Sequence, residues 1–555
     1  MKPRPSPILG LAMFLLASAG LLPAQTTATD YANQGIAKQQ KADYDGALAD
    51  YNQALELDPT DFKTHYNRGL VKKALRDFRG ALADFDQAIN LGATYDQVYN
   101  NRAAMRKAIG DFDGAIADFT ESLKLNPQQP AVYSGRGNAK QAKGDSVGAL
   151  ADLDQAIELE PKNANFYSSR SLAKKAKGDF DGAIADCDQA IALDPTLTNA
   201  YINRGGAKLE KRKLDEAIAD YDKAIELDPK SALAYNNRGN AKKLKGDFDG
   251  AATDYDKALE LDPKFVAAYV DRALSEIRKG SYYTAIADLD TAIALDPTYA
   301  LAYFNRGFVR QTVGDLDGAI VDYTQSVKLN SKLEVGYYNR GGAKKAKGDL
   351  DGAIADFDQA TVLNPKFTNA YLSRGNAKLT KDDFDGAIAD YDQTIALDPN
   401  QFIAYENRGI LRQTKGNYEG VITDYTKAIE LNPAKEDYIR FYLALTLRRL
   451  HRDETPAGLA QAVAGWKDGW QKTVGRFLMG KLKEDDFLTE AAKGDDKTVR
   501  EHQCEAFYYA GMTHLLKGDF NNARYFFNKC LDTEKVDFTE YLFARAELMH
   551  LPKKD

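Results

Sequence analysis

The sequence predicts an all-α solenoid of short helical hairpins, and three observations support this prediction. Prolines recur on a 34-residue grid from Pro59 to Pro433, and only Ala93 and Ser331 replace proline on that grid. Within each unit, small and aromatic residues recur at spacings of three to four, which places them on one face of a helix. The proline that follows each second helix prevents its continuation. Because a single hairpin cannot bury both of its faces, neighbouring units must stack.

The first 24 residues have the pattern of a signal peptide. Lys2 and Arg4 precede an apolar run from residue 8 to residue 22, which is too short for a comfortable membrane span. We expect cleavage after Ala24, with Ala19 as the alternative, and no Cys stands nearby to carry a lipid anchor. No later stretch approaches the roughly 18–20 apolar residues that a span requires. The sequence therefore predicts an exported protein, periplasmic or secreted, without a membrane span after signal removal.

Twelve repeats follow over residues 28–435, and we number each so that its grid proline is position 32. Position 4 is Tyr in eleven repeats, position 8 is always small, position 20 is Ala in eleven, and position 24 is mostly aromatic. If the two helices are antiparallel, positions that sum to 28 face each other. The small residues at 8 and 20 should then allow close helix approach, and the rings at 4 and 24 should stack.

The helix ends are also visible in the sequence. Position 15 is Gly in eight repeats, which suits the left-handed residue that ends a first helix. Position 16 is Asp in nine repeats and Ser281 or Asn417 in two others, and these residue types cap helix N-termini, whereas Lys213 does not. The recurrent Asp-Phe-Asp-Gly motif therefore opens a helix. It places Gly fourth, where a calcium-binding loop needs Gly sixth, so we reject a calcium site.

A 34-residue period with a small residue, Ala, an aromatic residue and Pro resembles the tetratricopeptide repeat family. The resemblance implies a right-handed superhelix with a concave groove lined by first helices, which holds extended segments of partner proteins. In that family an Asn at position 6 projects into the groove, where a carboxamide can both donate to and accept from a peptide backbone. The alternative interpretation is a solvated polar residue without a partner. The corresponding residues here are Asn33, Asn67, Asn101, Asn203, Asn237, Asn305, Asn339 and Asn407.

The chain departs from the family pattern at positions 7 and 23, which are Arg in eleven repeats and Asp in all twelve. One interpretation is a basic strip for an acidic ligand. We favour bidentate ion pairs within each hairpin, because the two columns occur together and a lone buried Arg would be costly. The Lys or Arg at position 11 is expected to lie across the ring at position 17 and reach water. Representative predicted pairs are Arg68 with Asp84, Arg204 with Asp220, and Arg306 with Asp322.

Repeats 8–10 are predicted to hold the strongest partner-binding surface, because positions 2, 5, 9 and 12 become apolar there. The alternative is that these apolar residues are hidden between adjacent first helices. The residues in question are Val270, Leu274, Phe304, Phe308 and Tyr338.

The C-terminal part should contain a degenerate helical repeat with connecting helices over 436–500, including helices near 474–482 and 484–493. Residues 501–555 should form a final hairpin with a capping helix over the open end of the stack. The segment 504–511, with residues 538–541 and 546–548, is similar to the C-terminal repeat of bacterial NlpI-type periplasmic proteins. The resemblance implies an adaptor that brings envelope enzymes together. Cys504 and Cys530 should face each other, either as a disulfide or as two packed thiols.

The composition suggests no catalytic chemistry. A formal net charge of −7 argues against a general nucleic-acid binder, and five His with three Cys are too few for a metal-rich protein. Residues 475–482 nearly match a phosphate-binding loop but end in Leu where Mg²⁺ needs a hydroxyl. We therefore expect a non-catalytic scaffold without metal or cofactor, of unspecified oligomeric state. The alternative is an enzyme with an unrecognised hydrolytic or transferase site in the C-terminal helical region.

Overall fold

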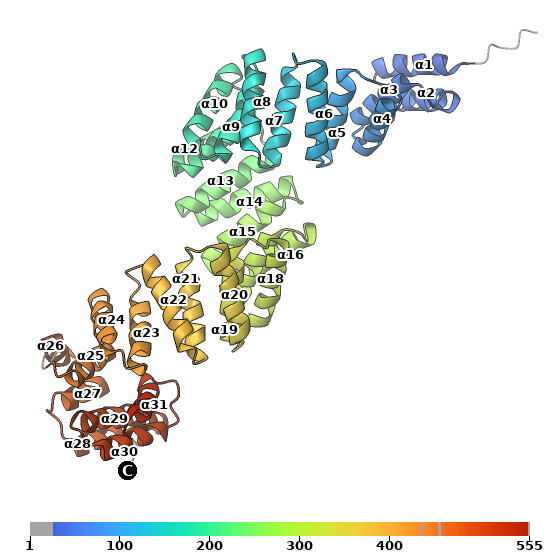
Figure 1. The fold of residues 1–555 in the computed structure, drawn as a ribbon. Coiled ribbons are helices and arrows are strands. Elements are labelled where there is room, and N and C mark those ends of the chain that lie inside the picture. The colour runs from blue at the N-terminus through green and yellow to red at the C-terminus, as the bar shows by residue number, and fades with distance from the viewer. Residues whose placement is uncertain (1–25, 434–436, 453–456, 553–555) are drawn as a thin grey trace, which may run out of the picture. The chain divides into compact units, whose positions relative to one another are not determined.

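The computed structural model describes residues 26–433, 437–452 and 457–552, and within these ranges it contains 31 α-helices and no strand (Figure 1). The predicted all-α hairpin solenoid is therefore confirmed. No helix in these ranges combines the length and the apolar character needed to cross a membrane. The predicted signal peptide, residues 1–24, lies outside the described residues.

The chain divides into two compact units, residues 1–275 and 276–555, and each is described separately. The division falls within one helix, α15 (Val266–Lys279). The other helices of the first unit are α1 (Ala28–Gln40), α2 (Tyr44–Leu57), α3 (Phe62–Ala74), α4 (Phe78–Asn90), α5 (Asp96–Ala108), α6 (Phe112–Leu125), α7 (Pro130–Ala142), α8 (Ser146–Leu159), α9 (Ala164–Ala176), α10 (Phe180–Leu193), α11 (Thr198–Glu210), α12 (Leu214–Leu227), α13 (Ala232–Lys245) and α14 (Phe248–Leu261).

The second unit continues the hairpins and then changes character. Its repeat helices are α16 (Tyr282–Leu295), α17 (Ala300–Thr312), α18 (Leu316–Leu329), α19 (Glu334–Ala346), α20 (Leu350–Leu363), α21 (Thr368–Thr380), α22 (Phe384–Leu397), α23 (Phe402–Thr414) and α24 (Tyr418–Leu431). The remaining helices are α25 (Asp437–Arg449), α26 (Ala457–Gly465), α27 (Trp470–Leu478), α28 (Glu484–Ala491), α29 (Asp496–Leu516), α30 (Phe520–Leu531) and α31 (Thr539–His550).

The core of each hairpin is built around the small residue at position 8. A Cβ added to Gly69 would lie 2.7 Å from the ring of Phe85 at position 24, so the ring packs directly on the glycine backbone. A Cβ added to Gly341 would also lie 3.1 Å from the carbonyl oxygen of Ala353 at position 20. The expected approach of positions 8 and 20 is therefore present. At these two glycines, a side chain could be accommodated only if the ring at position 24 moved.

The expected stacking of the rings at positions 4 and 24 is wrong. The position-24 ring instead contacts position 5 where that residue is aromatic, as in Tyr66–Phe85, with ring centroids 5.7 Å apart. The tyrosine at position 4 lies against the guanidinium of position 7, three residues further along the same helix; in repeat 11 the Arg374 carbon lies 5.2 Å from the Tyr371 centroid. Side chains at i and i+3 share a helix face, which explains this cation–π contact.

The ends of the helices follow the predicted chemistry, with one exception. Position 15 has a positive φ in all twelve repeats, including the four without Gly, namely Ala42, Arg76, Arg212 and Asp382. The cap residue at position 16 accepts a hydrogen bond from the N–H of position 19, as Asp111 does from Gly114 at 2.9 Å. The expected cap at Ser281 is wrong, because its side chain accepts no cap hydrogen bond, and Lys213 makes none either.

The capping geometry also explains the glycine at position 19. A Cβ added to Gly114 would lie 2.2 Å from Asp111 Oδ2, so a side chain there would push the capping carboxylate away. In the two repeats without a cap bond, position 19 is Glu216 or Thr284 rather than Gly. Cap and glycine therefore occur together and are lost together.

We predict that the double substitution Lys213→Asp with Glu216→Gly stabilises the first unit by about 1 kcal/mol, because it restores the hydrogen bond that the other caps make. Lys213→Asp alone should give less, since the Glu216 side chain occupies the position that the capping carboxylate needs. Urea denaturation of the single and double variants measures both effects. Equal stabilisation by the two variants would contradict the coupling.

The C-terminal part differs from its predicted boundaries. The helix of the final hairpin, α29, begins at Asp496, five residues before the expected start, and α27 begins at Trp470 rather than near residue 474. The pair Thr455-Pro456, whose residue types suit an N-cap followed by proline at the first helical position, lies outside the described residues. The last helix, α31, contacts α29 and α30 and also α23, the first helix of repeat 12. It therefore does more than cover the open end of the stack.

Candidate functional site: the first-helix face

We define the first-helix face as the surface made by positions 2, 5, 6, 9 and 12 of the first helices, on which the sequence places the binding residues. Behind it, the carboxylate at position 23 joins the two helices of each repeat. Arg68 Nη2 lies 2.6 Å from Asp84 Oδ1, and the same distance separates Arg204 from Asp220 and Arg306 from Asp322. These aspartates are buried. The structure thus places the Arg column in ion pairs rather than in a free basic strip.

Position 11 contributes a second cation to the same carboxylate, so the expectation that it simply reaches water is wrong. Lys72 Nζ lies 2.8 Å from Asp84 Oδ2. Burial alone would raise the pKa of Asp84, but hydrogen bonds and charge interactions with Arg68 and Lys72 hold it below its usual range. The position-11 side chain therefore helps to compensate a buried charge.

The Arg at position 7 also links neighbouring repeats, which the sequence reasoning missed. Its remaining nitrogen, Nη1, reaches position 25 of the preceding repeat, as Arg102 does to Asp86 at 2.8 Å and Arg306 to Asp290 at 2.6 Å. A signal was present, because position 25 is Asp in eight of the twelve repeats. Each Arg therefore holds its own hairpin and the joint to the previous one.

The predicted Asn column at position 6 divides into two groups. Three of these residues donate to the preceding repeat: Asn101 to Tyr66 Oη at 3.1 Å, Asn203 to Ser168 Oγ at 3.1 Å, and Asn407 to Asn376 Oδ1 at 2.9 Å. These three have structural roles. Among the described residues the other five have no hydrogen-bond partner, and they are Asn33, Asn67, Asn237, Asn305 and Asn339.

Repeat 8 shows the joint pattern most fully, because Asp271 replaces the Asn there. Asp271 accepts hydrogen bonds from Asn236 at 3.0 Å and Asn240 at 2.8 Å, and Lys243 Nζ lies 3.3 Å from it. These donors occupy positions 5, 9 and 12 of repeat 7. Position 6 therefore meets positions 5, 9 and 12 of the repeat before it.

The predicted apolar surface is only partly available for binding. Val270 is buried, so its assignment to the surface is wrong, and Leu274 is half-buried on the same helix, α15. In the second unit, Phe304 and Tyr338 are half-buried, with ring centroids 5.8 Å from Tyr323 and Phe357 respectively. Leu301 and Phe308 on α17 remain 46% and 43% exposed. The accessible apolar surface is therefore centred on α17.

In repeat 12 the first-helix face is covered by the C-terminal helices. Ile410 at position 9 is only 9% exposed, against 43% for Phe308 at the same position of repeat 9. Gln413 donates to Tyr508 Oη of α29 at 3.2 Å, and Arg545 of α31 lies 3.1 Å from Asp382 Oδ1 at the turn of repeat 11. No sequence periodicity could have indicated these contacts.

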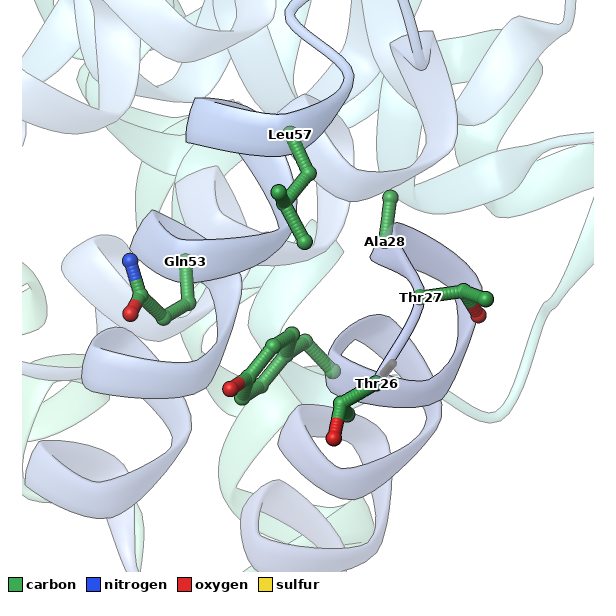
Figure 2. Close-up of a pocket in the computed structure, with 6 residues that line it drawn as sticks. Thr26, Thr27, Ala28, Gln53 and Leu57 are labelled. Carbon is green, nitrogen blue, oxygen red and sulfur yellow. The ribbon is translucent and has the colours of Figure 1, made fainter. Parts of the chain in front are cut away.

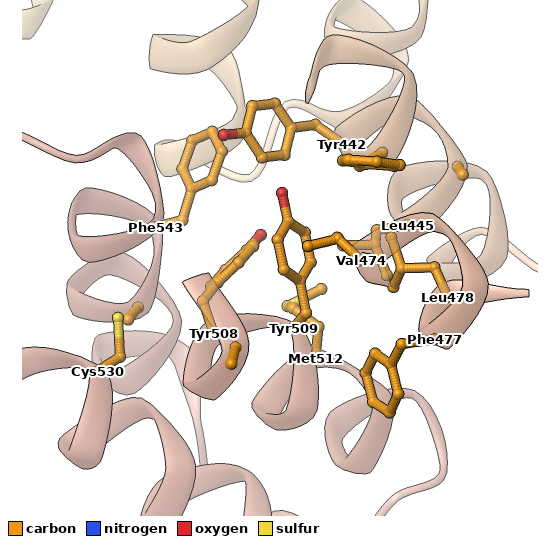
Figure 3. Packing of buried hydrophobic residues seen from close by; sticks show 14 of the residues in the cluster. Tyr442, Leu445, Val474, Phe477, Leu478, Tyr508, Tyr509, Met512, Cys530 and Phe543 are labelled. Carbon is orange, nitrogen blue, oxygen red and sulfur yellow. The ribbon is translucent and has the colours of Figure 1, made fainter. Parts of the chain in front are cut away.

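The C-terminal core is aromatic and contains three buried carboxyl groups. Figure 3 shows Tyr442, Tyr508, Tyr509 and Phe543 packed together there. Tyr442 and Tyr509 donate to Glu540 Oε1 at 2.6 and 3.0 Å. Another of these carboxyl groups, Glu547, pairs with Arg449, and Glu505 is the remaining one.

Glu505 lies in the same core and is 6% exposed. It accepts hydrogen bonds from Trp470 Nε1 at 2.9 Å and Tyr438 Oη at 3.3 Å. Burial and the neighbouring Glu540 raise its pKa to about 8. Among the described residues no group of three His, Cys, Asp or Glu could hold a metal ion.

At the other end of the chain, α1 and α2 border a hollow of about 580 Å³ (Figure 2). It is lined by Thr26, Thr27, Ala28, Tyr31, Gln53 and Leu57. The lining offers hydroxyl and amide groups but no charged side chain, and it contains none of the predicted binding residues.

Cys504 and Cys530 face each other in the C-terminal core, with their sulfur atoms 3.5 Å apart, and all three cysteines are free thiols. We predict that this pair forms a disulfide when the protein matures in an oxidising compartment, because the two thiolates need only small movements to join. Mass spectrometry after alkylation of the unfolded, unreduced protein should find Cys187 as the only modified cysteine. Three modified cysteines would contradict the prediction.

Comparison with known families agrees with this architecture. A family model described as TPR repeat matches residues 39–75, 207–246 and 273–314. Two models described as Tetratricopeptide repeat match residues 232–265 in one case, and 106–164, 134–198, 338–402 and 372–436 in the other. Together these ranges cover more than half of the chain. No protein of curated function matches it.

Several solved structures are similar to the chain. A tetratricopeptide repeat protein from Parabacteroides merdae is 20% identical, over 45% of this chain and 98% of its own, with a TM-score of 0.41. Yeast Tom70 is 18% identical, over 75% of this chain and 98% of its own, with a TM-score of 0.38. MamA is 29% identical, over 29% of this chain and 95% of its own, with a TM-score of 0.26. With its 34-residue hairpins, its small residue under an aromatic ring and the matching family models, the chain belongs to the tetratricopeptide repeat superfamily.

Proposed function

We propose that this protein is an exported, non-catalytic scaffold that binds extended segments of partner proteins on its first-helix face. Tetratricopeptide repeats serve in protein interaction, and the observation that carries the proposal is the contrast between repeats 9 and 12. In repeat 12 this face is covered by polypeptide of the same chain, with Ile410 buried. In repeat 9 the equivalent Phe308 is exposed. A surface that accepts polypeptide at one repeat is thus open at another.

The polar groups on this face support the same proposal. Asn305 and Asn339 have carboxamides without hydrogen-bond partners in the described part of the chain, and both are half-buried. A carboxamide in this position can donate to a peptide carbonyl and accept from a peptide N–H at the same time. Together with Leu301 and Phe308, these residues combine backbone recognition with apolar contact.

The proposal of a non-catalytic role is supported by the burial of the C-terminal carboxyls. Glu505 and Glu540 are enclosed by aromatic rings and already accept hydrogen bonds from Tyr and Trp side chains. A general acid or base must come within hydrogen-bond reach of its substrate. The predicted signal peptide and the resemblance to NlpI-type adaptors support export to the bacterial envelope and a role in assembling envelope proteins.

Affinity capture from envelope extract tests the proposal. The variant Asn305→Ala with Asn339→Ala and Phe308→Ala should retain fewer partner proteins than the parent, with unchanged helicity. Asn101→Ala is the matched control, because its carboxamide is engaged in a repeat joint rather than free. Equal capture by the parent and the triple variant would contradict binding at this face. The proposed export is tested separately by the N-terminal sequence of the mature protein, which should begin at Gln25.

A further inference from the structure

We propose that repeat 10 selects partner segments in which a bulky apolar side chain lies close to a carboxylate. The inference rests on the proposed function and narrows it to one class of partner. It is carried by two residues of α19, Gly342 and Lys345, and by the aromatic side chains beside them.

Gly342 leaves an open position on the first-helix face. A Cβ added to Gly342 would meet no atom within 4 Å, whereas one added to its neighbour Gly341 would lie 2.9 Å from the ring of Phe357. Position 9 carries Phe308 in repeat 9 and Asn376 in repeat 11. Repeat 10 therefore lacks a side chain where both neighbours present one, and the space can take a side chain from a ligand.

The surroundings of Gly342 are apolar and held in place. Tyr338 lies four residues earlier on α19 and hence on the same side of the helix. Its ring is fixed by Phe357 and Phe367, at centroid distances of 5.8 and 4.9 Å. Such fixed rings lose little conformational freedom on binding, which favours an apolar ligand side chain.

The exposed Phe308 extends this apolar surface. In the register of the joints, position 9 lies beside position 6 of the following repeat, as Asn376 does beside Asn407. Phe308 therefore lies beside Asn339, which is three residues before Gly342 on α19. The open position thus has an aromatic ring from each of two adjacent repeats in its vicinity.

Lys345 supplies the charge that a carboxylate would complement. It lies three residues after Gly342 on the same side of α19 and is half-buried, and burial lowers the pKa of its ammonium group. The ammonium has no hydrogen-bond or ion-pair partner among the described residues. A half-buried charge without an acceptor is unfavourable, so an anionic group of a ligand would gain by occupying the site.

Two of the four other lysines at position 12 find acceptors at position 6 of the next repeat. Lys73 Nζ donates to Asn101 Oδ1 at 2.7 Å, and Lys243 Nζ lies 3.3 Å from Asp271 Oδ1. In repeat 11, which follows Lys345, position 6 is Ser373, whose side chain is shorter than that of Asn or Asp. The acceptor for Lys345 is therefore missing from the chain itself, which is why we assign it to the partner.

Panning a phage-displayed library of random dodecapeptides against the full mature protein tests the inference. Peptides enriched on the parent protein should carry Leu, Phe or Trp within a few residues of Asp or Glu. Gly342→Leu fills the open position and should lower the enrichment of those peptides about tenfold or more, while it favours the helix. Panning on the Lys345→Glu variant should enrich peptides that carry Lys or Arg where the peptides selected on the parent carry Asp or Glu.

Gly206→Leu is the control, because it makes the same substitution at position 9 of repeat 6, in the other compact unit. There the added Cβ would lie 3.2 Å from Nζ of Lys175, at the end of a flexible side chain. This variant should leave the selected sequences unchanged. Far-UV circular dichroism of each variant verifies the fold. Peptides that are enriched without apolar and acidic residues, or that bind both α19 variants as well as the parent, would overturn the inference and leave the proposed function standing. No enrichment on the parent would overturn the proposed function and this inference with it.

Discussion

Replacing Asp322 with alanine should destabilise the second compact unit by about 3–5 kcal/mol, because it leaves two cations without their buried partner. Asp322 is 1% exposed and pairs with Arg306 at 2.6 Å and Arg310 at 2.9 Å. Without the carboxylate, both guanidinium groups remain partly buried and lose their ion-pair partner. Urea denaturation followed by circular dichroism measures the loss as a lower midpoint.

Asp290→Ala is the matched control, because Asp290 pairs with the same Arg306, also at 2.6 Å, from the preceding repeat. Its side chain is 52% exposed, so water screens the pair, and its removal should cost less than about 1 kcal/mol. Equal losses for the two variants would show that burial does not decide the strength of these ion pairs.

Raising the pH through about 8 should destabilise the C-terminal core, because Glu505 must ionise inside it. Burial and the neighbouring Glu540 raise the pKa of Glu505 from 4.5 to about 8. Between these values the folded protein binds more protons than the unfolded chain, so the free energy of unfolding falls as the pH rises. The total change is about 5 kcal/mol, at about 1.4 kcal/mol per pH unit between the two pKa values. The pKa of Glu540 is also raised by burial and adds in the same direction.

Glu505→Gln should remove most of this pH dependence, since its amide cannot ionise. The variant should match the parent near pH 5 and exceed it in stability near pH 9. Both tryptophans, Trp466 and Trp470, lie in this part of the chain, so their fluorescence reports its unfolding selectively. Glu547→Gln breaks the pair with Arg449 and should destabilise at both pH values. Parallel pH profiles for the parent and Glu505→Gln would contradict the assignment.

The sequence predicts the repeats well because each position plays the same role twelve times. The Gly at position 15 and the Asp at position 16 mark local backbone geometry that depends only on nearby residues. The pairing of positions 7 and 23 also lies within one hairpin, so Arg306 and Asp322 could be matched by their joint occurrence. Contacts between repeats are harder to predict, because the residue at position 25 pairs with the Arg of the next hairpin. The sequence of repeat 8 alone therefore offers no partner for Asp290.

Two parts of the candidate site could not be read from the sequence. Whether a carboxamide at position 6 has a hydrogen-bond partner depends on positions 5, 9 and 12 of the previous repeat. Asn407 finds a partner there in Asn376, whereas Asn305 finds none among the described residues. The contact of Gln413 with Tyr508 joins residues 95 apart, outside any repeat. Long-range packing of this kind leaves no periodic pattern, so the burial of the repeat-12 face appears only in three dimensions.

The cover over repeat 12 has a consequence for how such a chain can change its length in evolution. Inner repeats share the same joint, in which the position-7 Arg reaches back to position 25, so duplication or loss of 34 residues recreates an existing interface. Repeat 12 is different, because Ile410 and Gln413 are matched to residues of the C-terminal helices. A duplication of repeat 12 would leave one copy without that match. The array can therefore lengthen or shorten upstream of repeat 12, while its last repeat and the C-terminal helices are inherited together.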